Sequence, residues 1–325
     1  MLVRVRQQIT CGVTPPLPPL GEIIAGCVFS SFSHFLLHSY GLILRIPKYL
    51  RSPQNLGPPM TPDELSKILL LDEYQVLGIP QEDFARLEPH IGNRAYTYRP
   101  ATGELRIKVP SQLHGTVSSW ASDLRQEGEV VGAFDCRDLS LISEGSLQGF
   151  MGEYEGIIKV PDCAIVPRGR FWPTLVFEFG YTEPYEDLKA DVKLLLEGSA
   201  GKISKIIIIK LDPLRDGETE IQKGFVEIWH LVDGQVKKHG RRKILLFLIS
   251  KMKSLFPPPR SHAEQKLELS LRDILRSQLD NLANEGWGKE DTIALHFDRL
   301  RGYIEEATWR HLVQKGLLED DDESD

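Results

Sequence analysis

The chain has 325 residues, of which 41% are hydrophobic and 26% are charged. This composition is typical of a globular protein with room for one large domain or two modest ones. The formal net charge of −7 argues against nucleic-acid binding by the whole surface, although a local basic patch stays open. Four cysteines without a Cys-x-x-Cys pair argue against a zinc module or a disulfide framework. We therefore expect an intracellular protein, cytoplasmic or nuclear.

Residues 1–59 differ in composition from the rest and are expected to be an N-terminal extension. They contain an uncharged window, 23–44, that is long enough to span a bilayer. Serine and histidine residues dilute its middle, so a membrane is not expected as a partner except through this window. Four interpretations stay open: an organelle-targeting segment, a weak anchor, a docked helix, or an extension outside the folded domain. We expect the folded domain to begin at Met60.

The first elements after Met60 are predicted from capping residues and alternation. Thr61-Pro62-Asp63-Glu64 is typical of a helix start, because a hydroxyl cap, an early proline and acidic residues suit that end. A short helix is predicted over 81–87. Two strands, 95–100 and 104–109, are joined by Ala101-Thr102-Gly103, which indicates a hairpin. A helix carrying Val117, Trp120 and Leu124 follows.

The remaining prediction is an α/β core domain over 60–256 with a mixed sheet, followed by a helical C-terminal extension over 257–318 and an acidic disordered tail over 319–325. The predicted strands are 130–134, 139–143, 154–166, 173–179, 203–210, 225–231 and 244–249, and the predicted core helix is 185–197. In the extension, helices are predicted over 263–282, 290–302 and 304–315.

Two carboxylates stand in otherwise apolar strands. Asp162 shares a predicted strand face with Ile158 and Val160, and Glu178 shares one with Val176. A buried carboxylate needs a cation or strong hydrogen-bond donors, and a short link between the two strands would place the acids side by side. One divalent cation would relieve their repulsion. The alternatives are a turn aspartate that caps backbone amides and a structural salt bridge without metal.

The predicted helix after Glu178 carries two lysines on one face. Lys189 and Lys193 are four residues apart, so either side chain could extend back to the acids along the apolar stripe. An ammonium there would orient a water and offset charge on a phosphate. The alternative is a solvated lysine on the helix surface, or a structural ion pair between Lys193 and Glu178.

The order Pro161-Asp162, then Glu178-Phe179-Gly180, then a helix with Asp191 and Lys193 resembles the PD-(D/E)XK nuclease superfamily. The nearest likeness is to its putative restriction endonuclease domain branch (Uma-type). Upstream, the stretch 102–107 followed by Pro110-Ser111 and His114 is similar to that branch's entry. The resemblance covers residues 60–249 and rests on short, degenerate motifs. It implies a restriction-endonuclease-like mixed sheet flanked by helices.

The resemblance also implies a metal site. Asp162 and Glu178 would bind Mg²⁺ or Mn²⁺, with the backbone carbonyl of Phe179 as a further ligand. An acid from the first helix region is expected in many members, and Asp123 is a weak candidate for it.

The chain departs from the family pattern at the lysine of the motif, where it has Gly180. The resemblance implies that this lysine has moved to the next helix, with Lys193 as its counterpart and Lys189 as second choice. Arg170 and Tyr181, near the acids in sequence, are candidates for substrate contact.

These predictions support a Mg²⁺-dependent endonuclease-like protein that hydrolyses nucleic-acid phosphodiesters. A second hypothesis is a catalytically inactive restriction-endonuclease-like scaffold or binding module, favoured by Gly180 and the acidic net charge. The sequence leaves open whether the protein is an enzyme, whether nucleic acid is its partner, and whether it forms a homodimer.

Overall fold

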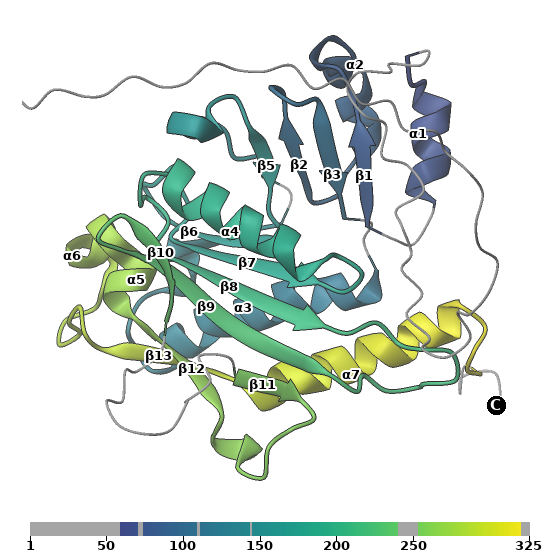
Figure 1. Cartoon of the computed structure of the whole chain (residues 1–325). Helices are drawn as coiled ribbons and strands as arrows, with labels where there is room; N and C mark the ends of the chain where they lie inside the picture. Colours follow the sequence, from purple (N-terminus) through teal and green to yellow (C-terminus); the bar gives the residue numbers. More distant parts are fainter. Residues whose placement is uncertain (1–58, 71–73, 109–110, 144, 240–252, 320–325) are drawn as a thin grey trace, which may run out of the picture. The chain divides into compact units, whose positions relative to one another are not determined.

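The computed structural model describes residues 59–70, 74–108, 111–143, 145–239 and 253–319. These residues belong to one compact unit, Pro47–Asp325. They form a mixed α/β fold with three sheets (Figure 1), so the predicted α/β class with a mixed sheet is confirmed at this level. The window 23–44, the predicted strand 244–249 and residues 320–325 lie outside the described residues. None of the described helices is long and apolar enough to cross a membrane.

A four-stranded antiparallel sheet contains the first part of the described chain. Its order is β1 (Gln75–Gly78), β3 (Glu104–Ile107), β2 (Tyr96–Arg99) and β5 (Ile158–Val160). Helices α1 (Pro62–Leu69) and α2 (Gln81–Ile91) pack their apolar sides on it. The predicted cap of α1 is confirmed, since Glu64 N donates to Thr61 Oγ1 at 3.2 Å. The predicted hairpin is also confirmed, with Gly103 at φ 64° in its turn.

A seven-stranded sheet forms the larger part of the fold. Its strands are β4 (Leu139–Ile142), β6 (Cys163–Pro167), β7 (Leu175–Gly180), β8 (Lys205–Leu211), β9 (Gly224–Val232), β10 (Gln235–Lys238) and β11 (Lys253–Phe256). Strands β7 and β8 are parallel and are joined through helix α4 (Tyr185–Gly198), while the other pairs are antiparallel. The crossover is needed because parallel neighbours cannot be joined by a tight turn.

Helices cover both faces of this sheet (Figure 1). On one face α4 packs over Val176, Ile206 and Ile208. On the other, α3 (Gln112–Val130) packs over Leu175, Phe177 and Phe179, and α7 (Phe297–Gln314) packs against α3 in the same core. These two sets alternate along β7, since successive side chains of a strand point to opposite faces. The predicted faces of β7 are thus confirmed, and Glu178 falls on the α4 side.

The predicted strand 154–166 is wrong, because the chain changes sheets within it. Strand β5 ends at Val160 in the four-stranded sheet, and β6 begins at Cys163 in the seven-stranded sheet. Pro161 lies at the change, where its lack of an amide proton ends the ladder of β5. Asp162 therefore occupies a junction between two sheets rather than the face shared by Ile158 and Val160.

Two further predictions are wrong. Helix α3 continues through Val130, so no strand begins there. The C-terminal segment is not wholly helical, because β12 (Lys266–Ser270) pairs with β13 (Thr292–His296). Leu267 and Leu269 alternate with charged residues, the pattern of a strand with one buried face, and they join the core beneath α3.

The other short elements of the C-terminal segment are helices α5 (Leu271–Leu275) and α6 (Leu279–Leu282). Single 3-10 turns occur at Cys136–Asp138, Gly152–Tyr154, His262–Glu264 and Arg276–Gln278.

Candidate functional site

A cluster of buried ionisable side chains lies at the carboxyl end of β7. The acidic cluster, as we name it, comprises Asp162, Glu178, Glu183, Asp191, Lys108 and Lys159. Each of these side chains is at most 5% exposed. Four carboxylates thus share their surroundings with two ammonium groups.

The β6–β7 hairpin brings the two sequence-predicted acids together. Its register places Cys163 opposite Phe177. Asp162 precedes Cys163 and Glu178 follows Phe177, so the antiparallel register places these two acids opposite each other. Asp162 Oδ2 accepts a hydrogen bond from Phe179 N at 2.7 Å, which holds its side chain beside the end of β7. The short link between β6 and β7 produces this arrangement.

Lys108 stands at the centre of the acidic cluster, and the sequence analysis missed it. Its Nζ donates to Asp162 Oδ2 at 2.7 Å and to Glu178 Oε2 at 2.5 Å, and lies 3.1 Å from Glu183 Oε2. The carbonyl of Phe179 accepts from the same Nζ at 3.4 Å. All three groups that the resemblance implies as metal ligands therefore contact one cation.

Lys159, Asp191 and Thr97 form the second half of the acidic cluster. Lys159 Nζ, from β5, donates to Asp191 Oδ2 and lies 3.1 Å from Glu178 Oε1. Thr97 Oγ1, from β2, donates to Asp191 Oδ1 at 3.2 Å. Asp191 comes from α4, so this half links the four-stranded sheet to the helix that covers the seven-stranded one. Lys159 is fully buried.

Burial and ion pairing divide the four carboxylates into two classes. Burial raises the pKa of Glu178 to about 7 and that of Glu183 to about 8, and Lys108 opposes this only in part. Burial acts in the same direction on Asp162, but Lys108 outweighs it and lowers the pKa of Asp162 to about 2. Lys159 likewise overcomes burial to lower the pKa of Asp191. Two ammonium groups are too few for four buried carboxylates.

Two carboxylate oxygens of the acidic cluster accept no hydrogen bond from any described residue. They are Glu178 Oε1 and Glu183 Oε2, and both are buried. Each lies 3.1 Å from a lysine Nζ, which is ion-pair distance, but the angles do not suit a hydrogen bond. Such unsatisfied buried oxygens are ligands that an additional cation could use.

The structure does not bring Lys189 or Lys193 to the acids. Lys193 is exposed on α4. Lys189 Nζ pairs with Glu186 Oε2 at 2.7 Å on the same helix and lies over the ring of Tyr185. Neither is among the described partners of the four carboxylates. The expectation that they extend back to the acids is wrong in this respect, because Asp191 and not a lysine occupies the side of α4 that faces the acidic cluster.

Gly180 explains why the motif lysine is missing from β7. A Cβ atom there would lie 2.5 Å from Leu188 Cδ1 and 3.1 Å from Lys210 Cδ. Leu188 is fully buried in α4, so a side chain at Gly180 would have to displace the Leu188 side chain within a packed core. The cations near the acids are instead Lys108, which directly follows β3, and Lys159 of β5.

The other sequence-predicted residues are dispersed. Tyr181 is near the acidic cluster, but Leu214 N donates to its hydroxyl at 2.9 Å. Arg170 lies in the loop before β7, at the opposite end of the strand.

Asp123 of α3 accepts a hydrogen bond from the Tyr303 hydroxyl at 3.1 Å between α3 and α7, away from the acidic cluster. His114 occupies the N3 position of α3, where its ring bonds Ser111.

Two pockets flank Lys108. One, of about 210 Å³, is lined by Asp162, Lys108, His114 and Ser118 among others. A much smaller one touches Glu183, Tyr74 and Tyr181. A larger pocket, about 730 Å³, lies elsewhere, between the 219–222 segment, Pro257 and Trp309. It contains none of the acidic-cluster residues.

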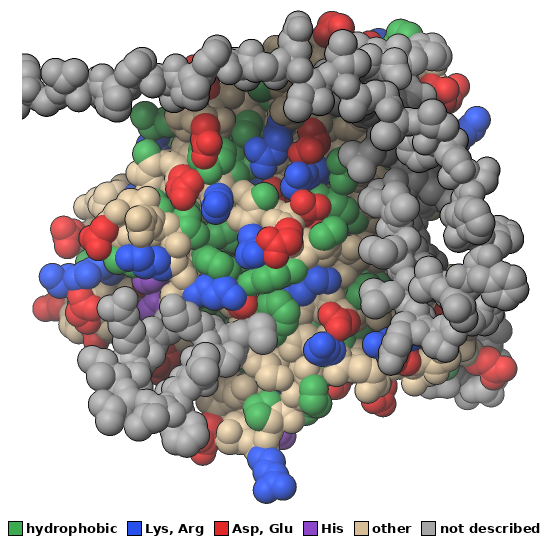
Figure 2. Space-filling model, in the orientation of Figure 1, with side chains coloured by type: hydrophobic (Ala, Val, Ile, Leu, Met, Phe, Trp, Pro, Cys, Tyr) green, Lys and Arg blue, Asp and Glu red, His purple; other side chains and the backbone are tan. Residues whose placement is uncertain are grey.

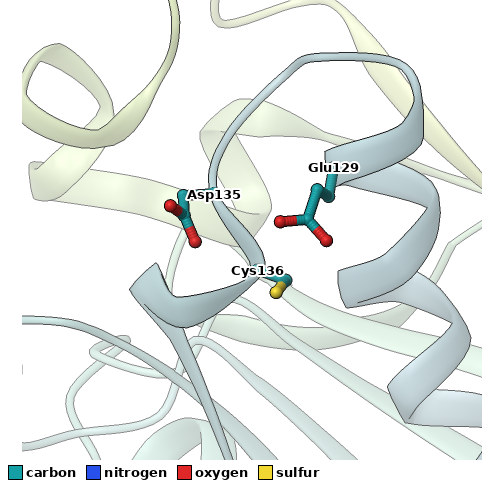
Figure 3. Close-up of side chains that lie close together, drawn as sticks. All are labelled: Glu129, Asp135 and Cys136. Atoms are coloured by element: carbon teal, nitrogen blue, oxygen red, sulfur yellow. The ribbon is translucent and has the colours of Figure 1, made fainter.

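A second group of candidate metal ligands lies at the end of α3 (Figure 3). Glu129, Asp135 and Cys136 place three ligand atoms within 4.8 Å of one another, closer than any three in the acidic cluster. Arg137 already binds both carboxylate oxygens of Asp135. A hydrogen bond with Glu129 raises the pKa of the Cys136 thiol, which disfavours the thiolate that a metal requires. This group is therefore the weaker candidate.

No protein-family model matches this sequence, and no curated protein matches it either. The likeness to the PD-(D/E)XK superfamily thus depends on the residues themselves. On the molecular face in Figure 2, cationic and acidic side chains are interspersed, so its charge pattern does not point to one partner. The arguments below rest on local geometry.

Proposed function

We propose that this protein is a divalent-metal-dependent nuclease-like hydrolase with a restriction-endonuclease-like arrangement of its sheet. The observation that carries this proposal is the convergence of Asp162, Glu178 and the Phe179 carbonyl on a single cation, the Lys108 ammonium. Oxygen ligands of this kind suit Mg²⁺ or Mn²⁺. The β6–β7 hairpin, the α4 crossover and parallel β8 support the proposed arrangement.

The donor set fits a divalent ion on two counts. It contains more carboxylates than ammonium groups, and two buried oxygens, Glu178 Oε1 and Glu183 Oε2, accept no hydrogen bond from described residues. The oxygens are spread around Lys108 more widely than they would be around a metal. Metal binding therefore requires the ammonium to leave the centre and the oxygens to close in.

In this proposal Asp162, Glu178, Phe179 and Glu183 hold the ion. A bound Mg²⁺ would lower the pKa of a water and offset charge on a phosphate. Lys108 and His114 line the pocket beside Asp162, so an ammonium group and an imidazole ring stand where a phosphodiester would enter. Lys108 takes the role that the resemblance assigned to Lys193. Lys159 holds Glu178 and Asp191 in position through an ion pair with each.

The test is cleavage of plasmid DNA, single-stranded DNA and RNA by the full chain in the presence of Mg²⁺ or Mn²⁺. Asp162→Asn and Glu178→Gln should each lower the rate by about 100-fold or more, because each removes a charged ligand. Glu186→Gln on the exposed side of α4 is the matched control and should keep full activity. Absence of cleavage of all three substrates by the wild type would refute the proposed activity.

The second candidate function is a binding module without catalysis. The observation that favours it is the same Lys108 ammonium, which pairs with three carboxylates and so satisfies part of their charge without a metal. Calorimetric titration with Mn²⁺ separates the two candidates. Heat that is lost in Asp162→Asn supports the metal site, whereas no heat in the wild type supports the binding module.

A further inference from the structure

Three cations gather at the amino ends of β7 and β8, opposite the acidic cluster. The basic corner, as we name it, consists of Arg170, Lys202 and Arg276, which come from three separate segments of the chain. Within the described residues, none of the three pairs with a carboxylate, although Lys205 nearby pairs with Asp273. Like charges held together without an acid form a site for an anion.

Backbone carbonyls and serine hydroxyls, not acids, hold the two arginine side chains. Arg170 Nη2 donates to the carbonyl of Lys202 at 3.1 Å, and its Nη1 donates to Ser277 Oγ at 2.9 Å. Arg276 Nη2 donates to the carbonyl of Gly201 at 2.8 Å. These bonds orient both guanidinium groups while using only part of their donors, since each group has five N–H bonds. The remaining donors are available to phosphate oxygens.

The backbone at Arg276 is strained. Its φ is 55° and its ψ is −124°, a conformation that long side chains rarely adopt and that glycine would adopt freely. Strain at a non-glycine residue persists only where the surrounding structure enforces it, and such positions are concentrated at functional sites. Here the strained turn directs the Arg276 guanidinium toward the loop that follows α4, beside Arg170.

An exposed aromatic ring stands next to these cations. Phe171, directly after Arg170, is 72% exposed, and its ring centroid lies 5.9 Å from that of the buried Trp172. Lys202 Nζ lies 5.1 Å from the centroid of the Trp172 ring. An exposed aromatic ring beside cations matches the way proteins bind single strands, with bases stacked on rings and phosphates on basic groups.

We propose that the basic corner binds single-stranded nucleic acid, with Phe171 stacking on a base and Arg170, Lys202 and Arg276 contacting phosphates. This surface goes beyond the proposed hydrolytic function, because it neither includes nor requires the acidic cluster. Strand β7 separates the two regions by about 17 Å along its length. An acidic peptide would use the cations but would leave the exposed ring without a partner.

The experiment measures binding of a fluorescent single-stranded oligonucleotide of about 12 nucleotides to the full chain, with a chelator present. The chelator prevents metal-dependent cleavage, so this result is independent of the proposed activity. Phe171→Ala should weaken binding by about 5- to 100-fold. Arg170→Gln and Arg276→Gln should each weaken it by about 5-fold or more and reduce its salt dependence.

Arg310→Gln on the exposed side of α7 is the matched control and should bind like the wild type. Phe171→Ala removes an exposed side chain, so it keeps the test meaningful if an arginine variant fails to fold. The proposal is overturned if the wild type does not bind, or if the variants bind like the wild type. It is equally overturned if inorganic polyphosphate competes as well as DNA and Phe171→Ala has no effect.

Discussion

The two ends of strand β7 carry charge in opposite ways. At the carboxyl end, four carboxylates and two lysines are almost completely removed from water and are held by one another. At the amino end, the basic corner keeps its cations at the surface and orients them through backbone carbonyls. One short strand thus separates a dense buried ion network from an open group of like charges.

This contrast shows how solvent decides what a charge requires. Cations that keep contact with water remain hydrated, so the half-buried Arg170 and the exposed Arg276 can stand side by side without an acid. Buried carboxylates lack hydration and need a cation, a donor or a proton. In the acidic cluster all three solutions occur. Asp162 and Asp191 are ion-paired and also accept hydrogen bonds, from Phe179 N and Thr97 Oγ1, while the raised pKa values of Glu178 and Glu183 favour protonation.

The largest effect is expected from removing the central cation. Lys108→Met leaves Asp162, Glu178 and Glu183 buried without their common partner. The free energy of unfolding in metal-free buffer should fall by about 3–5 kcal/mol, as measured by urea denaturation. Lys193→Met, on the exposed side of α4, should change it by no more than about 0.5 kcal/mol. A loss below about 1 kcal/mol for Lys108→Met would show that the network does not depend on this lysine.

The next largest effect is a pH dependence that originates in Glu183. Burial raises its pKa in the folded state, so its proton stabilises the fold at low pH and this contribution is lost as pH rises through about 8. Glu183→Gln removes the titration. The unfolding free energy of the wild type should fall relative to that of Glu183→Gln by on the order of 2–4 kcal/mol between pH 5 and 8.5.

The control for this pH dependence is Glu186→Gln, a substitution of an exposed carboxylate at the start of α4. This variant keeps Glu183, so its unfolding free energy should still fall relative to that of Glu183→Gln over the same pH range. A constant difference between the wild type and Glu183→Gln would contradict the raised pKa of Glu183.

A smaller effect is expected where β7 meets α4. Gly180→Ala would place a methyl group 2.5 Å from Leu188 Cδ1. The unfolding free energy should fall by about 1–3 kcal/mol, since the buried Leu188 side chain must shift within a packed core. Gly302→Ala on α7, where a Cβ meets nothing within 4 Å, is the control and should stabilise the protein by about 0.5–1 kcal/mol. If Gly180→Ala stabilises the protein as Gly302→Ala does, a steric clash with Leu188 does not explain why position 180 lacks the motif lysine.

The smallest effect is expected at the basic corner. Arg276→Ala removes bonds to the carbonyl of Gly201 and to Ser204 Oγ, and should lower the unfolding free energy by about 1 kcal/mol. Arg276→Gly loses the same bonds but relieves the positive φ, so its stability should be closer to that of the wild type. An Arg276→Gly variant less stable than Arg276→Ala would contradict the strain at this position.

The sequence predicted the local framework of the candidate site well. The alternation of Val176 and Glu178 with Phe177 and Phe179 gave the two faces of β7, and the lengths of the links indicated a hairpin and a helical crossover. Where the sequence-based prediction of the site failed, the cause is a contact with residues that are distant in the sequence. Pro161 ends one strand, but only the second sheet reveals that the chain leaves the first one there.

Alternation along a strand and capping of a helix are properties of neighbouring residues, so the sequence alone determined that Glu178 shares a face of β7 with Val176, opposite Phe177 and Phe179. The cation that meets this carboxylate was decided only by the tertiary structure. Lys108 is 70 residues before Glu178, and its position is set by packing the four-stranded sheet against the end of β7. Neutralising a buried charge depends on distance in space, which local sequence patterns do not encode.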